Sequence, residues 1–309
     1  MKKRFFAALI FAAFCMLFAG CQGYREIDSE YLITAIGFEE KEGRFTVFTE
    51  VLEIAADKKD TKSRLFLSDG KTPYEAVENI ADLLPKKAVF DHCPSAIIDS
   101  EIKGETLKRI IKYLYDTKNL NLGICLYCTD DIKELLSLKP QTNSVGYDIN
   151  AIKSNIEKTT GIPFKNKYYE ICSFEIEKKA FCLPQITVNG EDAQISNLTV
   201  YSNFSPSVCL TKSDAVIFNL LSFGSKGGEF SVSGEKYRVN RVRVKTKNAK
   251  DGIKIELHCK IRDKKENRAA KLKGAAEAVI KRVKNTPVAA LVSPHLAVAK
   301  NVKVIVYEN

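Results

Sequence analysis

The sequence predicts an α+β protein, with mixed sheets and layered helices in an N-terminal region and an antiparallel sheet plus a long helix in a C-terminal domain. Up to residue 140, strand and helix patterns alternate in the order β-β-α-β-α-β-α, which favours helices layered on a mixed sheet. Beyond residue 189, strand patterns dominate and one long helical pattern follows them. The chain has 309 residues, 45% of them hydrophobic, which is enough for one or two ordinary domains and excludes a disordered or collagen-like protein.

The N-terminal region begins with two segments rich in β-branched and aromatic residues, 31–38 and 44–54, and the turn EEKEG between them predicts a hairpin. A polar loop, 55–64, follows. Thr72, Pro73 and Glu75 then form a capping box with proline at the first helical position, and Pro85 ends this helix. The predicted buried stripe of the helix consists of Tyr74, Val77, Ile80, Ala81 and Leu84.

Three further elements complete the alternating part of the chain. A strand in the region 88–99 leads through Gly104 to a second helix, whose predicted buried face consists of Leu107, Ile110, Ile111 and Leu114. The run 122–128 is apolar throughout and predicts an interior strand. Asp130 or Thr129 is expected to cap a short helix that Pro140 ends.

The remaining N-terminal residues predict a helix over 145–160, broken by the sequence Gly-Ile-Pro that follows it, and paired strands over 168–188. The polar segment 189–194 predicts a surface turn near a domain boundary. We therefore expect an N-terminal domain over 21–188, with one or two subdomains, and a C-terminal β-β-α-β domain over 189–309.

The C-terminal domain contains two strongly alternating segments, 239–246 and 253–262. In the second segment, one face is expected to be buried (Ile253, Ile255, Leu257, Cys259 and Ile261) and the other solvated (Lys254, Glu256, His258, Lys260 and Arg262). Asp263 and Glu266 are expected to cap a helix that runs to about Lys284, with an apolar stripe of Leu272, Ala275, Ala276, Val279 and Val283. A last strand, 301–309, is expected to turn Val302, Val304 and Val306 inward.

The first 20 residues are typical of a signal peptide. Three basic residues precede an uncharged run of 16 residues, which is shorter than the roughly 20 residues needed to span a bilayer. Phe18-Ala19-Gly20-Cys21 resembles a bacterial lipobox, with Phe18 in place of the usual leucine. We therefore expect cleavage after residue 20 and lipidation of Cys21, whose acyl chains, palmitate among them, would anchor the mature chain to a membrane.

The net charge of +10 is unevenly distributed. Residues 231–309 carry 20 basic and 7 acidic side chains, whereas residues 21–230 carry 25 basic and 31 acidic ones. The basic third either solvates its own domain or contacts an anionic membrane surface or acidic partner, where each close Lys or Arg contributes about 1 kcal/mol. Nucleic acid is excluded by the exported location rather than by charge.

Cys125 and Cys128 form the most suggestive chemical motif, a C-x-x-C pair. In redox proteins such a pair lies at a helix N-terminus, where the thiol pKa is lowered. Here the pair lies in a strand-like run, which separates the two Cα atoms by roughly 10 Å and turns the side chains to opposite faces. Structural thiols are the preferred interpretation for this pair and for cysteines 93, 172, 182, 209 and 259.

No catalytic, metal or cofactor site is predicted. His92, His258 and His295 have no ligand spacing, and a zinc site needs about four convergent ligands. The segment 224–228 lacks the P-loop pattern and predicts a turn. The apolar segment 287–299 is expected to be a core loop rather than a docking patch.

Several segments together resemble the C-subunit lipoproteins of spore germinant receptors, the GerC-type family. These are YREIDSEYLITAIGFEE after Cys21, DGKTPYEAVENIADLLPKKAVFDHCPSAIID, and the helix ETLKRIIKYLYD. The sequence departs from the family where Gln22 and Gly23 replace the usual Trp-Asp, and the segment 285–301 is shorter than the family's Trp-containing region.

The resemblance implies a non-enzymatic subunit, anchored through Cys21 on the outer face of the spore inner membrane. It implies two partners, the integral membrane A and B subunits of the receptor, and a role in nutrient-triggered spore germination. The residues alone leave two other functional classes open. A solute-binding lipoprotein of a transporter would have two doubly wound lobes and a deep cleft, and an extracytoplasmic thiol enzyme would have a cysteine with a lowered pKa.

Overall fold

The computed structural model describes residues 30–53, 62–117, 120–177, 180–249, 252–261, 267–293, 295–296 and 299–308. The signal peptide, Cys21 and the predicted cap at Asp263 and Glu266 lie outside these ranges. Strands and helices are both abundant, and the α+β class is confirmed. The elements up to residue 176 are β1 (Glu30–Lys41), β2 (Arg44–Glu53), β3 (Lys62–Gly70), α2 (Pro73–Leu83), β4 (Lys87–Val89), β5 (Ser95–Asp99), α3 (Gly104–Asp116), β6 (Cys125–Thr129), α4 (Ile132–Leu136), α5 (Val145–Thr160) and α6 (Tyr168–Ile176).

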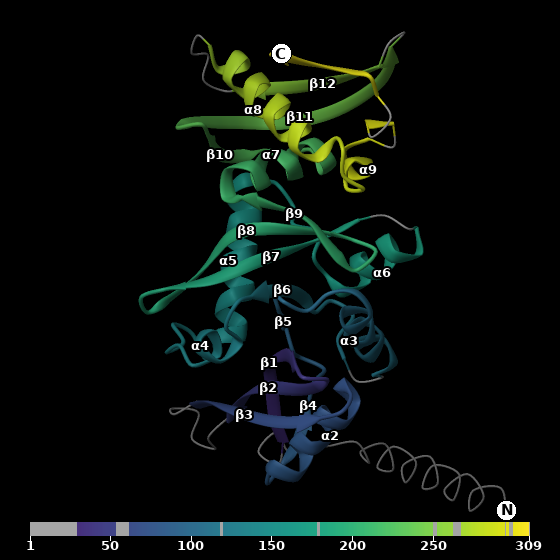
Figure 1. Ribbon diagram of the computed structural model, residues 1–309. Helices are drawn as coiled ribbons and strands as arrows, with labels where there is room; N and C mark the ends of the chain where they lie inside the picture. The colour runs from purple at the N-terminus through teal and green to yellow at the C-terminus, as the bar shows by residue number, and fades with distance from the viewer. Residues whose placement is uncertain are drawn as a thin grey trace, which may run out of the picture.

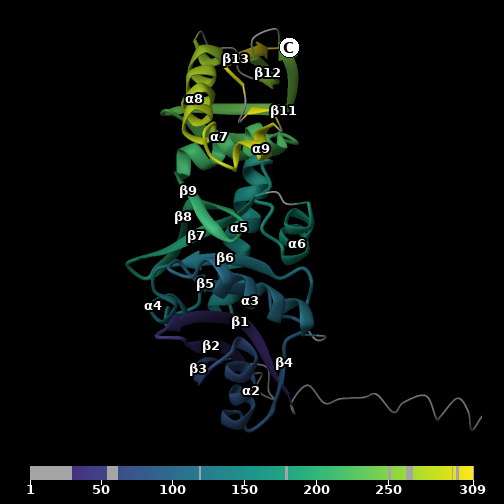
Figure 2. The same cartoon turned by 45° about the vertical axis from the view of Figure 1, so that its right-hand side comes forward.

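The later elements form the rest of the first sheet and a second one. They are β7 (Phe181–Asn189), β8 (Asp192–Ser202), β9 (Ser205–Thr211), α7 (Lys212–Phe223), β10 (Gly228–Val232), β11 (Glu235–Ala249), β12 (Gly252–Ile261), α8 (Arg268–Val283), α9 (Ala289–Val292) and β13 (Asn301–Glu308). Figure 1 shows the strands near the N-terminus at one end of an elongated molecule and the second sheet at the other, and Figure 2 agrees.

Among the described residues the first sheet has nine strands, in the order β3-β2-β1-β5-β6-β7-β8-β9, with β4 beside β1. The central strands β1, β5, β6 and β7 are parallel, and the flanking hairpins are antiparallel. Parallel strands require covered faces, and every residue of β5 and β6 is buried. Helices α2, α3 and α6 contribute to the hydrophobic cluster on one face, and α4, α5 and α7 contribute to the cluster on the other.

Local capping explains where several helices begin. The Thr72 hydroxyl accepts a hydrogen bond from the Glu75 amide at 3.1 Å and Pro73 is the first helical residue, as predicted, while the Glu75 carboxylate accepts from the Lys71 amide. Helix α4 is capped by Asp131, not by Asp130 or Thr129. The Asp130 carboxylate instead accepts hydrogen bonds from Ser100 and Gln185 in neighbouring parts of the sheet.

The predicted stripe of α2 is only partly right. Ile80 and Leu84 are buried as predicted, but Ala81 is exposed and Tyr74 is 60% exposed, and Pro73 and Ala76 are buried instead. The helix backbone at Ala76 packs so closely on Gly70 that a Cβ there would overlap it, and the Ser68 hydroxyl donates to the Ala76 carbonyl. Because the helix packs this closely on β3, Pro73 and Ala76 face the sheet and Tyr74 faces solvent.

Three strand predictions need correction. The region 88–99 contains two short strands, β4 and β5, separated by a turn. The sequence did not reveal β3, because the first residues of this edge strand were assigned to a polar loop. The segment 168–176, expected to be a strand, is helix α6, because Tyr168 and Ile171 are three residues apart and both pack into the core.

The C-terminal sheet has the order β10-β11-β12-β13 among the described residues. Strands β10, β11 and β12 are antiparallel, and β13 is parallel to β12 because α8 crosses over between them. The inward face of β12 is buried as expected, and so is the stripe of α8 except for Ala275, which is half-buried. Buried side chains after α8 are Val288, Ala289, Val292, Leu296 and Ala299. The described part of segment 287–299 is therefore core, as predicted.

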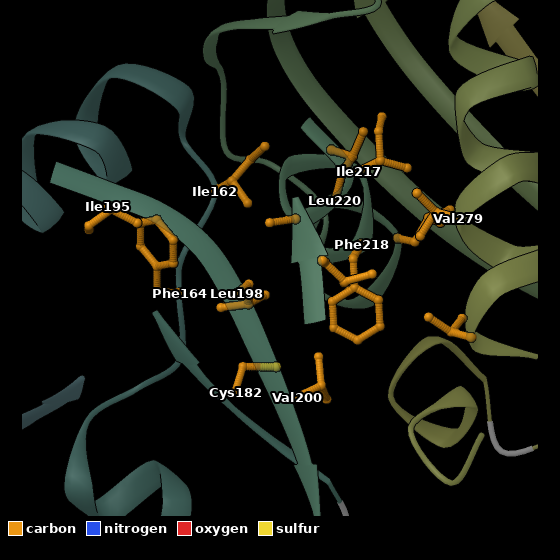
Figure 3. Close-up of a cluster of buried hydrophobic side chains, with 14 of the residues drawn as sticks. Ile162, Phe164, Cys182, Ile195, Leu198, Val200, Ile217, Phe218, Leu220 and Val279 are labelled. Carbon is orange, nitrogen blue, oxygen red and sulfur yellow. The ribbon is translucent and has the colours of Figure 1, made fainter. Parts of the chain in front are cut away.

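The predicted boundary between residues 188 and 189 falls at the turn of the β7–β8 hairpin. This turn is confirmed, but both of its strands belong to the nine-stranded sheet, and the chain passes to the second sheet only after β9. Figure 3 shows why the two sheets are not separated: Ile195 and Leu198 of β8, Phe218 of α7 and Val279 of α8 belong to one buried cluster. The division into domains stays a prediction.

Candidate interaction surfaces

The described chain begins at Glu30, which pairs with Lys87 at the end of the molecule that holds β4. Cys21, the predicted lipidation site, precedes it by a segment of eight residues, 22–29. At 3.3–3.6 Å per residue, the nine steps from Cys21 to Glu30 reach at most about 32 Å. Within the described ranges, no helix is both long and apolar enough to span a membrane.

The Cys125 and Cys128 thiols lie on opposite faces of strand β6, in the two different core clusters. Burial raises the pKa of the Cys128 thiol to about 12 and also raises that of Cys125. Neither side chain is in a disulfide, and neither lies at a helix N-terminus. The preferred interpretation of the pair as structural thiols is confirmed, and the structure gives no support to a redox site here.

The other cysteines and the histidines are spread over several elements of the fold, apart from the neighbouring pairs His92–Cys93 and His258–Cys259. Cys93, Cys182 and Cys259 are buried, Cys172 is half-buried and Cys209 is exposed. His92 lies in the turn before β5, His258 on β12 and His295 after α9. In the part of the chain that the structure describes, no three His, Cys, Asp or Glu side chains are arranged to hold a metal ion.

A strongly basic surface covers the outer face of the C-terminal sheet, on the side opposite α7 and α8. We call it the basic sheet face. Its described acidic residues are Glu229 and Glu256, and its basic residues are Lys236, Arg238, Arg241, Arg243, Lys245, Lys247, Lys254, Lys260 and Lys303. Among the described residues, no carboxylate lies within ion-pair distance of five of these cations: Arg241, Arg243, Lys245, Lys260 and Lys303.

Glu256 lies on the basic sheet face, and the prediction made for it was wrong. It was expected to be solvated, but its side chain is only 3% exposed. The Lys254 and Lys247 ammonium groups contact its carboxylate at 2.7 and 2.9 Å, and these hydrogen bonds lower its pKa to about 2. Beside it, the His258 ring stacks on Tyr307 with centroids 4.8 Å apart.

A groove of about 470 Å³ runs between helices α3 and α6, and we call it the α3–α6 groove. One wall is the outer face of α3, from Glu105 to Tyr115, and the other is the ridge of α6 formed by Tyr168, Cys172 and Ile176. The two walls are held together by a hydrogen bond of 3.1 Å from the Tyr168 hydroxyl to the Ile111 carbonyl. The sequence did not reveal this groove, because residues 168–176 were expected to form a strand.

Helix α5 connects the first strands to the second sheet. At its N-terminus, the buried Glu50 carboxylate accepts hydrogen bonds from the Val145 and Gly146 amides at 2.7 and 2.9 Å and from the Thr34 hydroxyl at 2.8 Å. An acidic group is favourable there because the helix dipole is positive at this end. A Cβ at Gly146 would overlap the Thr34 carbonyl oxygen, so the helix can approach β1 only with glycine.

The C-terminus of α5 contacts the second sheet directly. Gly161 caps the helix with φ of 67°, and its carbonyl accepts a hydrogen bond from the Lys226 amide at 3.1 Å. The Ser225 hydroxyl donates to the Thr160 carbonyl at 3.1 Å. Because both ends of one helix are fixed by backbone contacts, α5 holds the two sheets in a defined arrangement (Figure 1).

Comparisons with known proteins agree with the resemblance seen in the sequence. The model of the family described as "Spore germination protein N-terminal domain" matches residues 23–188. A search of curated proteins found no match. Among solved structures, the chain matches one described as "Crystal Structure of the GerBC protein", with a TM-score of 0.43 and 9% identity over 88% of this chain and 96% of that chain.

The family match extends from the start of the predicted mature chain to the turn of the β7–β8 hairpin and covers more than half of the sequence. It includes the segments that carry the resemblance, the strands β1, β2, β5 and β6 and the two walls of the α3–α6 groove. The chain therefore belongs to the spore germination protein family defined by this N-terminal domain, the family of germinant-receptor C subunits.

Proposed function

We propose that this protein is a membrane-anchored lipoprotein subunit of a spore germinant receptor and is needed for nutrient-triggered germination. The observation that carries the proposal is the family match over residues 23–188. The buried thiols with raised pKa values and the surfaces described above support a role in protein contacts rather than in chemistry.

The proposed anchor is the lipid on Cys21, on the outer face of the spore inner membrane. The lipobox-like sequence before this residue supports it. Each buried CH₂ contributes about 0.8 kcal/mol, so two or three acyl chains hold a protein on a bilayer where one chain is marginal. Confinement to the membrane raises the effective concentration of the chain near membrane-embedded partners.

The proposed partners are the integral membrane A and B subunits of the receptor. The test is to purify a tagged copy of the full chain from detergent-solubilised spore membranes and to measure the two subunits that accompany it. We expect both subunits in amounts comparable to the tagged chain. Recovery of the tagged chain without either of them would contradict the assignment.

The basic sheet face supports a second proposal, contact with anionic lipid headgroups. Five of its cations have no carboxylate partner among the described residues, and this charge attracts an anionic surface within about a Debye length, roughly 8–10 Å. The unlipidated Cys21→Ala chain should bind anionic vesicles at low salt and be released as salt rises. Equal binding to neutral and anionic vesicles would mean that these residues only solvate the domain.

The alternative of a solute-binding lipoprotein is not favoured. That class predicts two doubly wound lobes, whereas the second sheet here is mostly antiparallel and shares a continuous hydrophobic cluster with the first. The family match points to germination instead.

A further inference from the structure

The two walls of the α3–α6 groove have different chemistry. The α6 wall consists of residues four apart on one side of the helix: Tyr168, which is buried, Cys172, which is half-buried, and the exposed Ile176. The α3 wall carries Lys108, Arg109 and Lys112 along its successive turns. A partner that fills the groove must therefore place apolar side chains toward α6 and polar or acidic side chains toward α3.

The groove exposes large apolar side chains at its ends. Ile176 is 82% exposed and Tyr115 is 70% exposed, more than the other large apolar residues of the described chain. Leu122 and Tyr169 are exposed as well and lie beside the N-terminus of α6, where the Tyr169 amide donates to the Leu122 carbonyl. Ile176 and Tyr115 both line the groove, and exposed apolar residues that share one groove are typical of a protein contact surface.

The charge of the groove is basic. Glu105 is its one acidic lining residue, and it pairs with Lys108 at 3.9 Å. Arg109 lies over the Phe45 ring, and neither Arg109 nor Lys112 has a carboxylate partner in the described ranges. The occupant is expected to supply at least two acidic groups along the α3 wall.

We propose that the α3–α6 groove binds an amphipathic helix with an acidic flank from one of the two membrane subunits. The α3 wall extends from Glu105 to Tyr115, about 15 Å at 1.5 Å per residue, and so fits roughly three turns of a helix. Apolar residues at i, i+4 and i+7 would pack against the α6 ridge, as in other helix-in-groove complexes. The proposal rests on the proposed function, because that function supplies the partner.

Cys172 on the groove wall provides a footprint, and the exposed Cys209 on β9 is its internal control. The full-length chain is labelled with a maleimide, first alone in detergent micelles and then in the complex with the membrane subunits, and the labels are counted by mass spectrometry. We expect complex formation to slow labelling of Cys172 about tenfold or more while labelling of Cys209 is unchanged. Equal labelling of Cys172 in both samples would overturn the proposal. Labelling of Cys172 that slows as the concentration of the chain alone is raised would also overturn it, by showing that a second copy fills the groove.

Surface substitutions test the same groove without disturbing the core. Ile176→Glu and Lys112→Glu should each reduce recovery of the membrane subunits about tenfold or more, because both change the wall and neither is buried. Leu83→Glu on α2 and Lys133→Glu on α4 are matched controls on exposed positions outside the groove and should leave recovery unchanged. Figure 1 shows α4 on the side of the molecule away from α3.

The outcomes separate the two proposals. If the wild-type chain recovers both membrane subunits and the groove variants recover them equally well, the groove is not the contact site and the subunit role stands. If the wild-type chain recovers neither subunit, the proposed function itself is wrong, and the groove proposal falls with it.

Discussion

At the scale of single residues, burial decides the chemistry of the cysteines. The Cys93 and Cys128 thiols have their pKa raised to about 12, because burial disfavours the charged thiolate. A reactive cysteine needs the opposite environment, one that is electropositive and partly exposed. The thiols of the core therefore contribute to packing, and among the cysteines that the structure describes Cys172 and Cys209 are the more accessible to reagents.

This difference predicts an order of alkylation in the native protein. At pH 8, Cys209 should react first and Cys172 more slowly, while Cys125 and Cys128 should react only through unfolding. Mass spectrometry of samples quenched over time gives the order, and a urea-unfolded sample is the control in which all the thiols react. Rapid labelling of Cys125 in the native protein would revive the redox interpretation.

The Glu256 carboxylate predicts a pH-dependent contribution to stability. Its pKa is lowered from 4.5 to about 2 by hydrogen bonds from Lys254 and Lys247, so the folded state favours the ionised form. This contribution is present above about pH 4.5 and is lost as the pH falls toward 2.

Glu256→Gln should accordingly lower the free energy of unfolding at pH 7, and its difference from the wild type should shrink as the pH falls through this window. Urea denaturation at pH 7 and pH 3 measures both differences. A difference that is the same at the two pH values would show that the carboxylate charge is not responsible.

At the scale of elements, the sequence predicted best those helices and strands that are long or have clear end signals, such as the Gly-Ile-Pro sequence after residue 160. The helix over 145–160 was placed correctly, and the strand predicted over 122–128 exists as Cys125–Thr129, whereas Leu122 at its predicted start is exposed. The apolar pattern of segment 168–176 is compatible with both the helical period of about 3.6 residues and the strand period of two. Its packing against α3 makes it a helix. Glu256 alternates like a solvated residue, but lysines from two strands cover it.

The α3–α6 groove was not predictable for the same reason. Tyr115 lies off the buried stripe of α3 and is exposed, but one exposed side chain does not indicate a groove. The opposite wall exists only because α6 is a helix that brings Tyr168, Cys172 and Ile176 into line. Which face of that helix meets α3 depends on the hydrogen bond from Tyr168 to Ile111, a contact 57 positions apart in the chain.

The contact between α5 and β1 predicts a strong effect of one methyl group. Gly146→Ala places a Cβ against the Thr34 carbonyl oxygen and should lower the free energy of unfolding by about 2–3 kcal/mol. Gly274→Ala on α8 is the matched control, since no atom lies within 4 Å of its added Cβ, and it should stabilise the protein by about 1 kcal/mol. Chemical denaturation of both variants makes the comparison. Equal effects would contradict the close packing of α5 on β1.

At the scale of the whole molecule, two connected sheets form an elongated body. The described chain enters at the end that holds β4, and the basic sheet face belongs to the sheet at the other end (Figure 2). With a lipid on Cys21, the basic sheet face reaches the same bilayer only when the long axis of the body lies along the membrane. Such an arrangement suits a protein that connects membrane partners.

The anchor gives a prediction at this scale. Cys21→Ala should move the protein from the detergent phase to the aqueous phase in a phase-partitioning assay, because the acyl chains that hold it are lost. Cys209→Ala is the control and should partition like the wild type. Detergent-phase partitioning that persists in Cys21→Ala would mean that another part of the chain binds the membrane.

The central claim is that this chain is required for nutrient-triggered germination, and germination of spores that lack it is the most direct measurement. Spores without the chain should fail to germinate with the nutrient that their receptor detects, and they should germinate normally with a trigger that bypasses nutrient receptors. A wild-type copy should restore the nutrient response. Normal germination of the deleted spores with every nutrient to which the parent strain responds would contradict the account.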